Sequence, residues 1–127
     1  MSWNYRNYGN SHGKPDPFST YHDGEAILKF LVEEMGIEGK IGCFGRSLGG
    51  TVATHLANHY PNHISLLFVD RSFGSLLKMS ESTMIGRWSQ PILLLCSRNW
   101  VINSHINFYN ANCFKILTQD PWDLTID

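Results

Sequence analysis

The chain has 127 residues, of which 43% are hydrophobic and 17% charged, proportions typical of a globular protein with one domain. Ten basic and eleven acidic residues give a formal net charge of -1, which provides no basic surface for nucleic acid or for an anionic membrane. We therefore expect a single domain over residues 1–127 that binds no nucleic acid.

The first part of the chain predicts a loop followed by a helix. Aromatic residues within residues 1–8 precede a segment rich in Gly, Pro, Asn and Ser over 9–17, which is typical of a strand end running into a loop. A capping residue at Ser19 or Thr20 and apolar residues at positions 27, 28, 31 and 32 predict an amphipathic helix of about four turns. Gly36 is its expected end.

The middle of the chain predicts a strand, a helix and a second strand. Residues 39–44 form a short apolar run, residues 48–60 have helical periodicity up to Pro61, and residues 64–69 form a continuous apolar run that ends at Asp70. Strands without polar alternation, joined by helices, are typical of a parallel sheet covered on both faces. The expected fold class is therefore α/β, with a mostly parallel sheet flanked by helices.

The remaining segments are less regular. Residues 72–84 are mixed, and residues 91–96 fit either a buried strand or a short buried helix. Residues 113–118 predict a strand, and residues 120–123 (DPWD) predict a turn after it.

The residues with the clearest chemical meaning lie between the first strand and the second helix. Gly45-Arg46-Ser47-Leu48-Gly49 matches Gly-x-Ser-x-Gly, preceded by a strand and followed by a helix, as a nucleophile elbow requires. Such a turn strains the backbone, lifts the serine hydroxyl clear of the sheet and needs small residues two positions before and after the serine. We predict Ser47 as the nucleophile and the Leu48 N–H as an oxyanion donor, a contact worth about 3 kcal/mol of barrier.

The pattern has two alternative interpretations. A glycine-rich turn that only packs tightly remains open. A phosphate-binding loop does not fit, because the segment lacks both the lysine of Gly-x-x-x-x-Gly-Lys-Ser/Thr and the Gly-x-Gly-x-x-Gly pattern.

Residues 4–15 (NYRNYGNSHGKP) resemble the loop Asn-Tyr-Arg-Gly-Tyr-Gly-x-Ser-x-Gly-x-Pro of the α/β-hydrolase superfamily, in a eukaryotic group with depalmitoylase-like and lipase-like members. Asn7 replaces the usual glycine. Residues 23–26, 45–51 and 69–73 resemble the same group. The resemblance implies a partial α/β-hydrolase fold, no cofactor, and an ester or thioester substrate carried by a small molecule or an acyl-protein.

A serine nucleophile needs a histidine base and an acid that orients it, in the chain order Ser, Asp, His. Asp123 resembles the acid of the family's Asp-x-Val-Ile segment and is the first choice. Asp70, at the end of the strand after the elbow, is the second, although with Arg71 it also fits a local ion pair. Asp120 precedes a proline and indicates turn chemistry.

The sequence supplies no residue at the position of the family histidine, which follows the last strand. His63 and His105 precede Asp123 and fit surface or core roles better than a base. A complete hydrolase domain typically needs about 200 to 250 residues, so we expect early strands and a final histidine-bearing segment to be absent from this chain. Missing strands would leave apolar sheet edges exposed and favour self-association.

Two functional hypotheses follow. The first is a serine hydrolase that cleaves an ester or thioester through an acyl-enzyme at Ser47. The second is a catalytically inactive α/β-hydrolase-like protein or interaction protein that lacks the triad histidine. An unrelated α/β ligand-binding module is disfavoured by the strand–Ser47–helix context.

Other chemistry is not indicated. Three cysteines without a Cys-x-x-Cys pair predict neither disulfides nor zinc, and Cys43 fits a small buried hydrophobe. His55 and His59 share a helix face but lack a third ligand, so we expect packed or solvated histidines and no metal. No apolar run is long enough to cross a membrane and no signal peptide is present, which predicts a reducing, cytoplasmic location. Arg46 and Trp122 are weaker candidates for pocket-lining residues.

Overall fold

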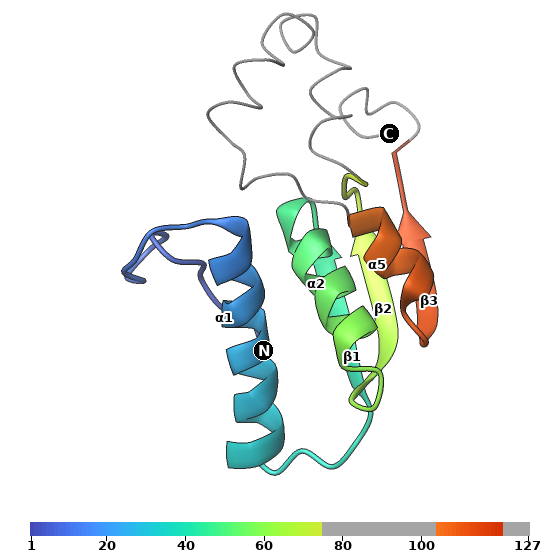
Figure 1. Cartoon of the computed structure of the whole chain (residues 1–127), viewed down its shortest axis with the longest axis horizontal. Helices are drawn as coiled ribbons and strands as arrows, with labels where there is room; N and C mark the ends of the chain where they lie inside the picture. The colour runs from blue at the N-terminus through green and yellow to red at the C-terminus, as the bar shows by residue number, and fades with distance from the viewer. Residues whose placement is uncertain (75–103, 121–127) are drawn as a thin grey trace, which may run out of the picture.

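The computed structural model describes residues 1–74 and 104–120, which form a three-stranded sheet and the helices packed against it (Figure 1). The elements in chain order are α1 (Pro17–Lys29), the π-helical segment η1 (Phe30–Glu34), β1 (Ile41–Arg46), α2 (Leu48–His59), β2 (Ile64–Asp70), α5 (Ser104–Asn110) and β3 (Phe114–Thr118).

The three strands are parallel and lie in the order β1-β2-β3, so the predicted α/β class with a parallel sheet is confirmed. Phe44 pairs with Phe68, which pairs with Ile116, and Arg46 pairs with Asp70, which pairs with Thr118. The carboxyl ends of all three strands therefore meet at one edge of the sheet. Ser47 follows β1 at this edge.

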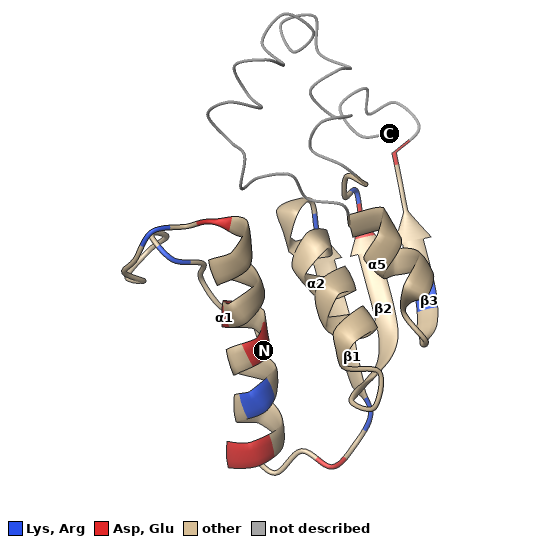
Figure 2. Ribbon diagram, viewed as in Figure 1, with Lys and Arg blue, Asp and Glu red and all other residues tan. Residues whose placement is uncertain are grey.

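One face of the sheet is covered by α2, which packs on β1 and β2 and also contacts α1 and α5 (Figure 1). This helix carries no Lys, Arg, Asp or Glu, as its uniform tan colour in Figure 2 shows, because most of its surface faces other elements. Ala57 and Leu67 are fully buried between helix and sheet. Burying a side chain such as that of Leu67 stabilises the fold by about 2 kcal/mol.

The opposite face of the sheet is largely uncovered by the described residues. Successive side chains of a strand point to opposite faces, so Phe44, Leu66, Phe114 and Ile116 share this second face. Phe44 is 64% exposed and Phe114 69% exposed. Such exposure of neighbouring large apolar side chains is unusual for a monomer.

The helix α1 begins earlier than the sequence predicted. Its N-cap is Asp16, not Ser19 or Thr20: the Asp16 carboxylate accepts the Ser19 N–H at 3.0 Å and the Ser19 hydroxyl lies 3.0 Å from the Asp16 N–H, a reciprocal capping box. Pro17 occupies the first helical position, which suits its fixed φ. The expected stop at Gly36 is confirmed, since Gly36 has a φ of 63° just after η1.

Two further differences concern strands and helices. Residues 1–8 form turns and irregular backbone instead of a strand, because no described strand lies beside them to pair with. The short helix α5 was not predicted from the sequence. The segments 91–96 and 121–127, with Cys96, Trp122 and Asp123, lie outside the described residues.

Candidate active site

Ser47 occupies a sharp turn between β1 and α2, with φ 51° and ψ -121°. A residue other than glycine in such a conformation costs about 1–3 kcal/mol, so the surrounding contacts must hold it. The predicted strained strand-to-helix turn is present.

Close packing at this turn depends on two glycines. A Cβ at Gly45 would lie 2.6 Å from the Gly50 nitrogen and overlap the Gly49 carbonyl, and a Cβ at Gly50 would lie 2.5 Å from the Cβ of Ser72. A Cβ at Gly49 would meet no described atom closer than the Tyr5 hydroxyl, at 3.7 Å. The requirement for small residues therefore falls on Gly45 and Gly50, whereas the sequence had assigned it to Gly45 and Gly49.

The backbone of Ser47 is held on both sides. Its N–H donates to the Asp70 carbonyl at 3.1 Å, and its own carbonyl accepts the Gly50 N–H at 3.0 Å and the Ser72 hydroxyl at 2.8 Å. The Ser47 side chain, in contrast to its backbone, takes no part in capping α2. A serine at an N-cap usually caps the helix with its hydroxyl, but the Ser47 side chain makes no such bond and the residue is exposed.

Leu48 is the first residue of α2, so its N–H has no acceptor within the helix. The N–H groups at the start of a helix and the helix dipole both favour negative charge, here beside Ser47. A hydroxyl beside N–H donors of this kind can attack a carbonyl carbon, and the donors can stabilise the oxyanion that results.

The carboxylate of Asp70 belongs to a polar cluster at the same edge of the sheet. It accepts the Thr118 hydroxyl at 2.9 Å, and it lies 3.6 Å from the Nε atoms of both Arg46 and Arg71. Arg71 itself has a φ of 44°, and its N–H donates to the Thr118 carbonyl at 2.9 Å. The arrangement matches the local ion pair considered for Asp70 and Arg71. Asp120 lies 4.0 Å from the Arg71 guanidinium.

The two alternative bases differ in position. His63 directly precedes the first residue of β2, whereas the Ser47 N–H donates to the carbonyl of Asp70, the last residue of β2. His63 and Ser47 therefore lie at opposite ends of this seven-residue strand, about 20 Å apart at about 3.3 Å per residue. His105 lies at the carboxyl edge, where its Nδ1 is 3.0 Å from the Gly74 carbonyl, beside a cavity of about 240 Å³. Within residues 1–74 and 104–120, no hydrogen bond joins either histidine to Ser47.

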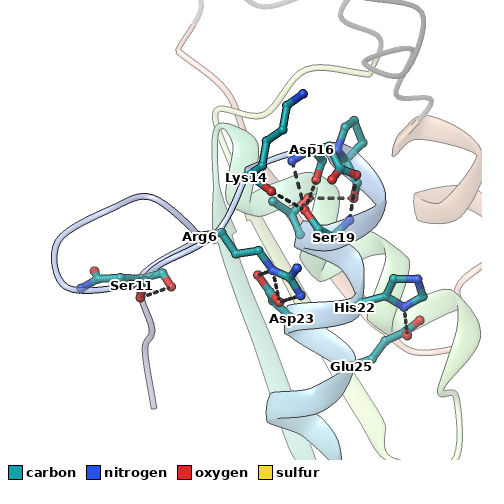
Figure 3. Close-up of polar contacts among 11 residues, drawn as sticks. Arg6, Ser11, Lys14, Asp16, Ser19, His22, Asp23 and Glu25 are labelled. Atoms are coloured by element: carbon teal, nitrogen blue, oxygen red, sulfur yellow. Dashed lines mark hydrogen bonds and ion pairs between the residues drawn. The ribbon is translucent and has the colours of Figure 1, made fainter.

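The loop that precedes α1 is tied to that helix by an ion pair. Two guanidinium nitrogens of Arg6 donate to the Asp23 carboxylate at 2.8 to 3.1 Å (Figure 3). Asn7, which stands where the related loop has glycine, has a φ of 67°. This left-handed conformation explains why the position holds glycine in the related loop and asparagine here: glycine adopts it freely, and asparagine tolerates it better than most residues.

A carboxylate, several histidine rings and a tyrosine ring form a cluster where α1 contacts α2. The carboxylate of Glu25 lies 3.0 Å from His22 Nδ1 and 2.8 Å from His55 Nε2, and the His55 ring stacks between Tyr21 and His59. His55 is partly buried in this contact and His59 is exposed, which agrees with the packed or solvated roles expected for the two histidines. Among the described residues, no group of three or more His, Cys, Asp or Glu is arranged to hold a metal ion.

Burial, together with the neighbouring Cys113, raises the pKa of the Cys43 thiol to about 11. The thiol is therefore protonated near neutral pH and a poor nucleophile. Arg46, 59% exposed at its side chain, lines a groove of about 690 Å³ beside β1 together with Trp3, Tyr5 and Gly49.

A family model described as "alpha/beta hydrolase fold" matches residues 2–100, which include residues 45–49. The chain belongs to the alpha/beta-hydrolase family. A relative from Arabidopsis thaliana, "Alpha/beta hydrolase domain-containing protein WAV2", is 37% identical over 124 residues, which are 97% of this chain and 36% of the relative. "Protein bem46" of Schizosaccharomyces pombe is 34% identical over 97 residues, 76% of this chain and 32% of bem46.

A solved structure agrees with this family. The chain superposes with a TM-score of 0.77 on the crystal structure of an alpha-beta hydrolase from Vibrio vulnificus, at 24% identity, and covers 46% of that chain. This likeness shows the α/β-hydrolase fold. The chain spans about a third of the length of the two curated relatives given above. No helix in the described part of the chain is long and apolar enough to cross a membrane.

Sequence reasoning missed three residues that support the elbow: Gly50, Ser72 and Thr118. Ser72 lies in the segment 69–73, which resembles the family, but the sequence indicates no role for it. Their contacts join residues 20 or more positions apart, such as Ser72 and Ser47, so no local pattern could reveal them.

Proposed function

We propose that this alpha/beta-hydrolase chain acts as a serine hydrolase that cleaves a carboxylic ester or thioester through an acyl-enzyme at Ser47. The observation that carries the proposal is the state of Ser47: it stands at the N-cap of α2 in a strained backbone conformation, and its exposed hydroxyl takes no part in capping. A serine that is exposed, strained in its backbone and free of a capping bond among the described residues is suited to nucleophilic attack.

The proposed reaction has two stages. The Ser47 Oγ attacks the acyl carbonyl while a base takes its proton, and the tetrahedral oxyanion is stabilised by the Leu48 N–H at the start of α2. The intermediate collapses to an acyl-enzyme and releases the alcohol or thiol, which takes up the proton. Water then repeats the attack, releases the acid and frees the Ser47 hydroxyl.

Asp123 remains the proposed acid that orients the base. The polar cluster of Asp70 supports that choice indirectly, because the Asp70 carboxylate already accepts the Thr118 hydroxyl and faces two arginines. By the resemblance of residues 4–15, we propose that the acyl group is carried by a small molecule such as a lipid, or by an acyl-protein.

A fluorophosphonate probe tests the proposal on the full-length protein. We expect labelling of the wild-type protein and its loss in Ser47→Ala, while Ser65→Ala, on β2, keeps it. Labelling that persists in Ser47→Ala would contradict Ser47 as nucleophile. Absence of any labelling in the wild type would favour the inactive, interaction-protein alternative over the enzyme.

We also propose that the chain self-associates through its exposed sheet edges and the apolar face beside them. Within the described residues, β1 and β3 are each paired on one side only, and four large apolar side chains on one face are at least 36% exposed. Edges and faces of this kind favour pairing with another chain. A cytoplasmic location remains a prediction from the sequence.

A further inference from the structure

The Ser47 carbonyl is bonded from two directions. It accepts the Gly50 N–H at 3.0 Å, within the first turn of α2, and the Ser72 hydroxyl at 2.8 Å, from the segment that follows β2. The first bond is local to the helix. The second joins the elbow to a residue 25 positions later in the chain.

This carbonyl and the Leu48 N–H belong to the same peptide group. A peptide group is planar and trans, so its C=O and N–H point in opposite directions and turn as one unit. Among the described residues no cis peptide is present. A hydrogen bond that fixes the direction of the Ser47 oxygen therefore also fixes the direction of the Leu48 N–H, and it polarises that N–H as a donor.

The packing around position 50 is tight. The Cβ of a residue other than glycine at position 50 would overlap the Ser72 hydroxyl and lie 3.1 Å from Val69 Cγ1. Because Gly50 has no side chain, the Ser72 side chain can approach the turn at Ser47. The Ser47 N–H, on the other side of the residue, is held by the Asp70 carbonyl at 3.1 Å, two residues before Ser72.

We propose that Ser72 is a positioning residue that orients the Leu48 N–H toward the oxyanion through the peptide group shared by Ser47 and Leu48. The inference rests on the proposed function and deepens it. Ser72 touches neither the substrate nor the reacting oxygen in this proposal. It acts on the donor, so its removal should affect the chemical step more than binding.

The kinetic test measures labelling by an alkyl fluorophosphonate over a range of probe concentrations. In Ser72→Ala we expect the maximal labelling rate to fall about three- to tenfold, the range that one neutral hydrogen bond supports, with the half-saturating probe concentration unchanged. Ser72→Thr, which keeps the hydroxyl, should recover most of the rate.

Ser65→Ala is the matched control, because the Ser65 hydroxyl also donates to a backbone carbonyl, that of Ile41 in β1 at 3.4 Å, and lies at the far end of β2. It should label at the wild-type rate. A wild-type rate in Ser72→Ala, or an equal loss in Ser65→Ala, would overturn the proposal.

A second measurement separates this proposal from the proposed function. The Leu48 amide nitrogen shift in NMR reports hydrogen bonding to the Ser47 carbonyl whether or not the protein reacts. We expect Ser72→Ala to move this signal and Ser65→Ala to leave it in place. If the wild type takes up no probe, the hydrolase proposal fails, and the Leu48 shift alone decides the role of Ser72: an unmoved signal in Ser72→Ala would exclude it.

Discussion

Position 45 requires glycine because two backbone segments cross there in close contact. The carbonyl of Gly49 and the nitrogen of Gly50 pass so close to Gly45 that any Cβ would collide with backbone, which cannot move aside as a side chain can. The same crossing places Ser47 at the tip of the turn. Residue-scale changes here should therefore act on both stability and reactivity.

Replacing Gly45 with alanine should destabilise the protein by about 2–4 kcal/mol, because overpacking against backbone forces the turn to shift. Urea unfolding measures this loss. Gly39→Ala is the control, since a Cβ at Gly39 would have no described atom within 4 Å. Equal unfolding midpoints for the two variants would show that the crossing is less tight than described.

At the scale of elements, α1 holds the loop before it through an ion pair and meets α2 through both apolar and polar side chains. Asp23 on α1 receives the Arg6 guanidinium, and Gly24, one residue later, lets α2 approach, since a Cβ there would lie 2.7 Å from Val52 Cγ1. One turn of α1 thus fixes both the loop and the neighbouring helix.

Replacing Asp23 with asparagine should loosen the loop while leaving the sheet intact, because the neutral amide keeps the size of the side chain but loses the charge-assisted pairing with Arg6. Hydrogen exchange at Asn7 and Ser11, whose N–H groups bond within the loop, should become faster. Exchange in β2 should stay unchanged. Faster exchange throughout the chain would contradict a local role.

The contact between α1 and α2 should also make stability depend on pH. Burial lowers the pKa of His55 below its ordinary value, and the hydrogen bond from His55 lowers the pKa of Glu25. Both groups bind protons more readily in the unfolded chain, so stability should fall as pH falls, first below about 6.5 through His55 and then below about 4.5 through Glu25.

Urea midpoints at several pH values between 7.5 and 5 test the first step. The wild-type midpoint should decrease over this range, and the decrease should be smaller in His55→Gln, which keeps a polar side chain but does not titrate. His22 and His59 border the same cluster and are present in both proteins. A midpoint that is constant with pH in the wild type would contradict the prediction.

At the scale of the whole molecule, the two faces of the sheet differ. One face packs on α2, while the other presents Phe44, Phe68 and their neighbours, with the rings of Phe44 and Phe68 5.2 Å apart. Arg46, Asp70 and Thr118 close this face at the carboxyl edge. An apolar face with a polar border is typical of a surface that another chain covers.

Sedimentation equilibrium should detect self-association of the wild-type chain, weakened in Phe44→Glu because a charge on the exposed face must lose its hydration on association. Met35→Glu is the control, because Met35 is 54% exposed but follows η1, away from the sheet. A monomeric wild-type chain would exclude this interface.

The sequence by itself determined the elements with strong local signals. The apolar runs that became β1, β2 and β3, the helical period of α2 and the Gly45-Arg46-Ser47-Leu48-Gly49 pattern all follow from local sequence, because burial and backbone strain act on neighbouring residues. The start of α1 was also readable from Asp16-Pro17-Phe18-Ser19, although Ser19 or Thr20 was chosen as cap.

Only the tertiary structure decided which residues support the elbow. Ser72, Thr118 and Asp70 come together because parallel strands align their carboxyl ends, and the register of that alignment is set by packing across the sheet. Residues 1–8 did not form the expected strand end, because among the described residues no strand lies beside them to pair with. Ser47 was visible from the pattern around it, whereas the bonds that hold its peptide in place depend on residues distant in the chain.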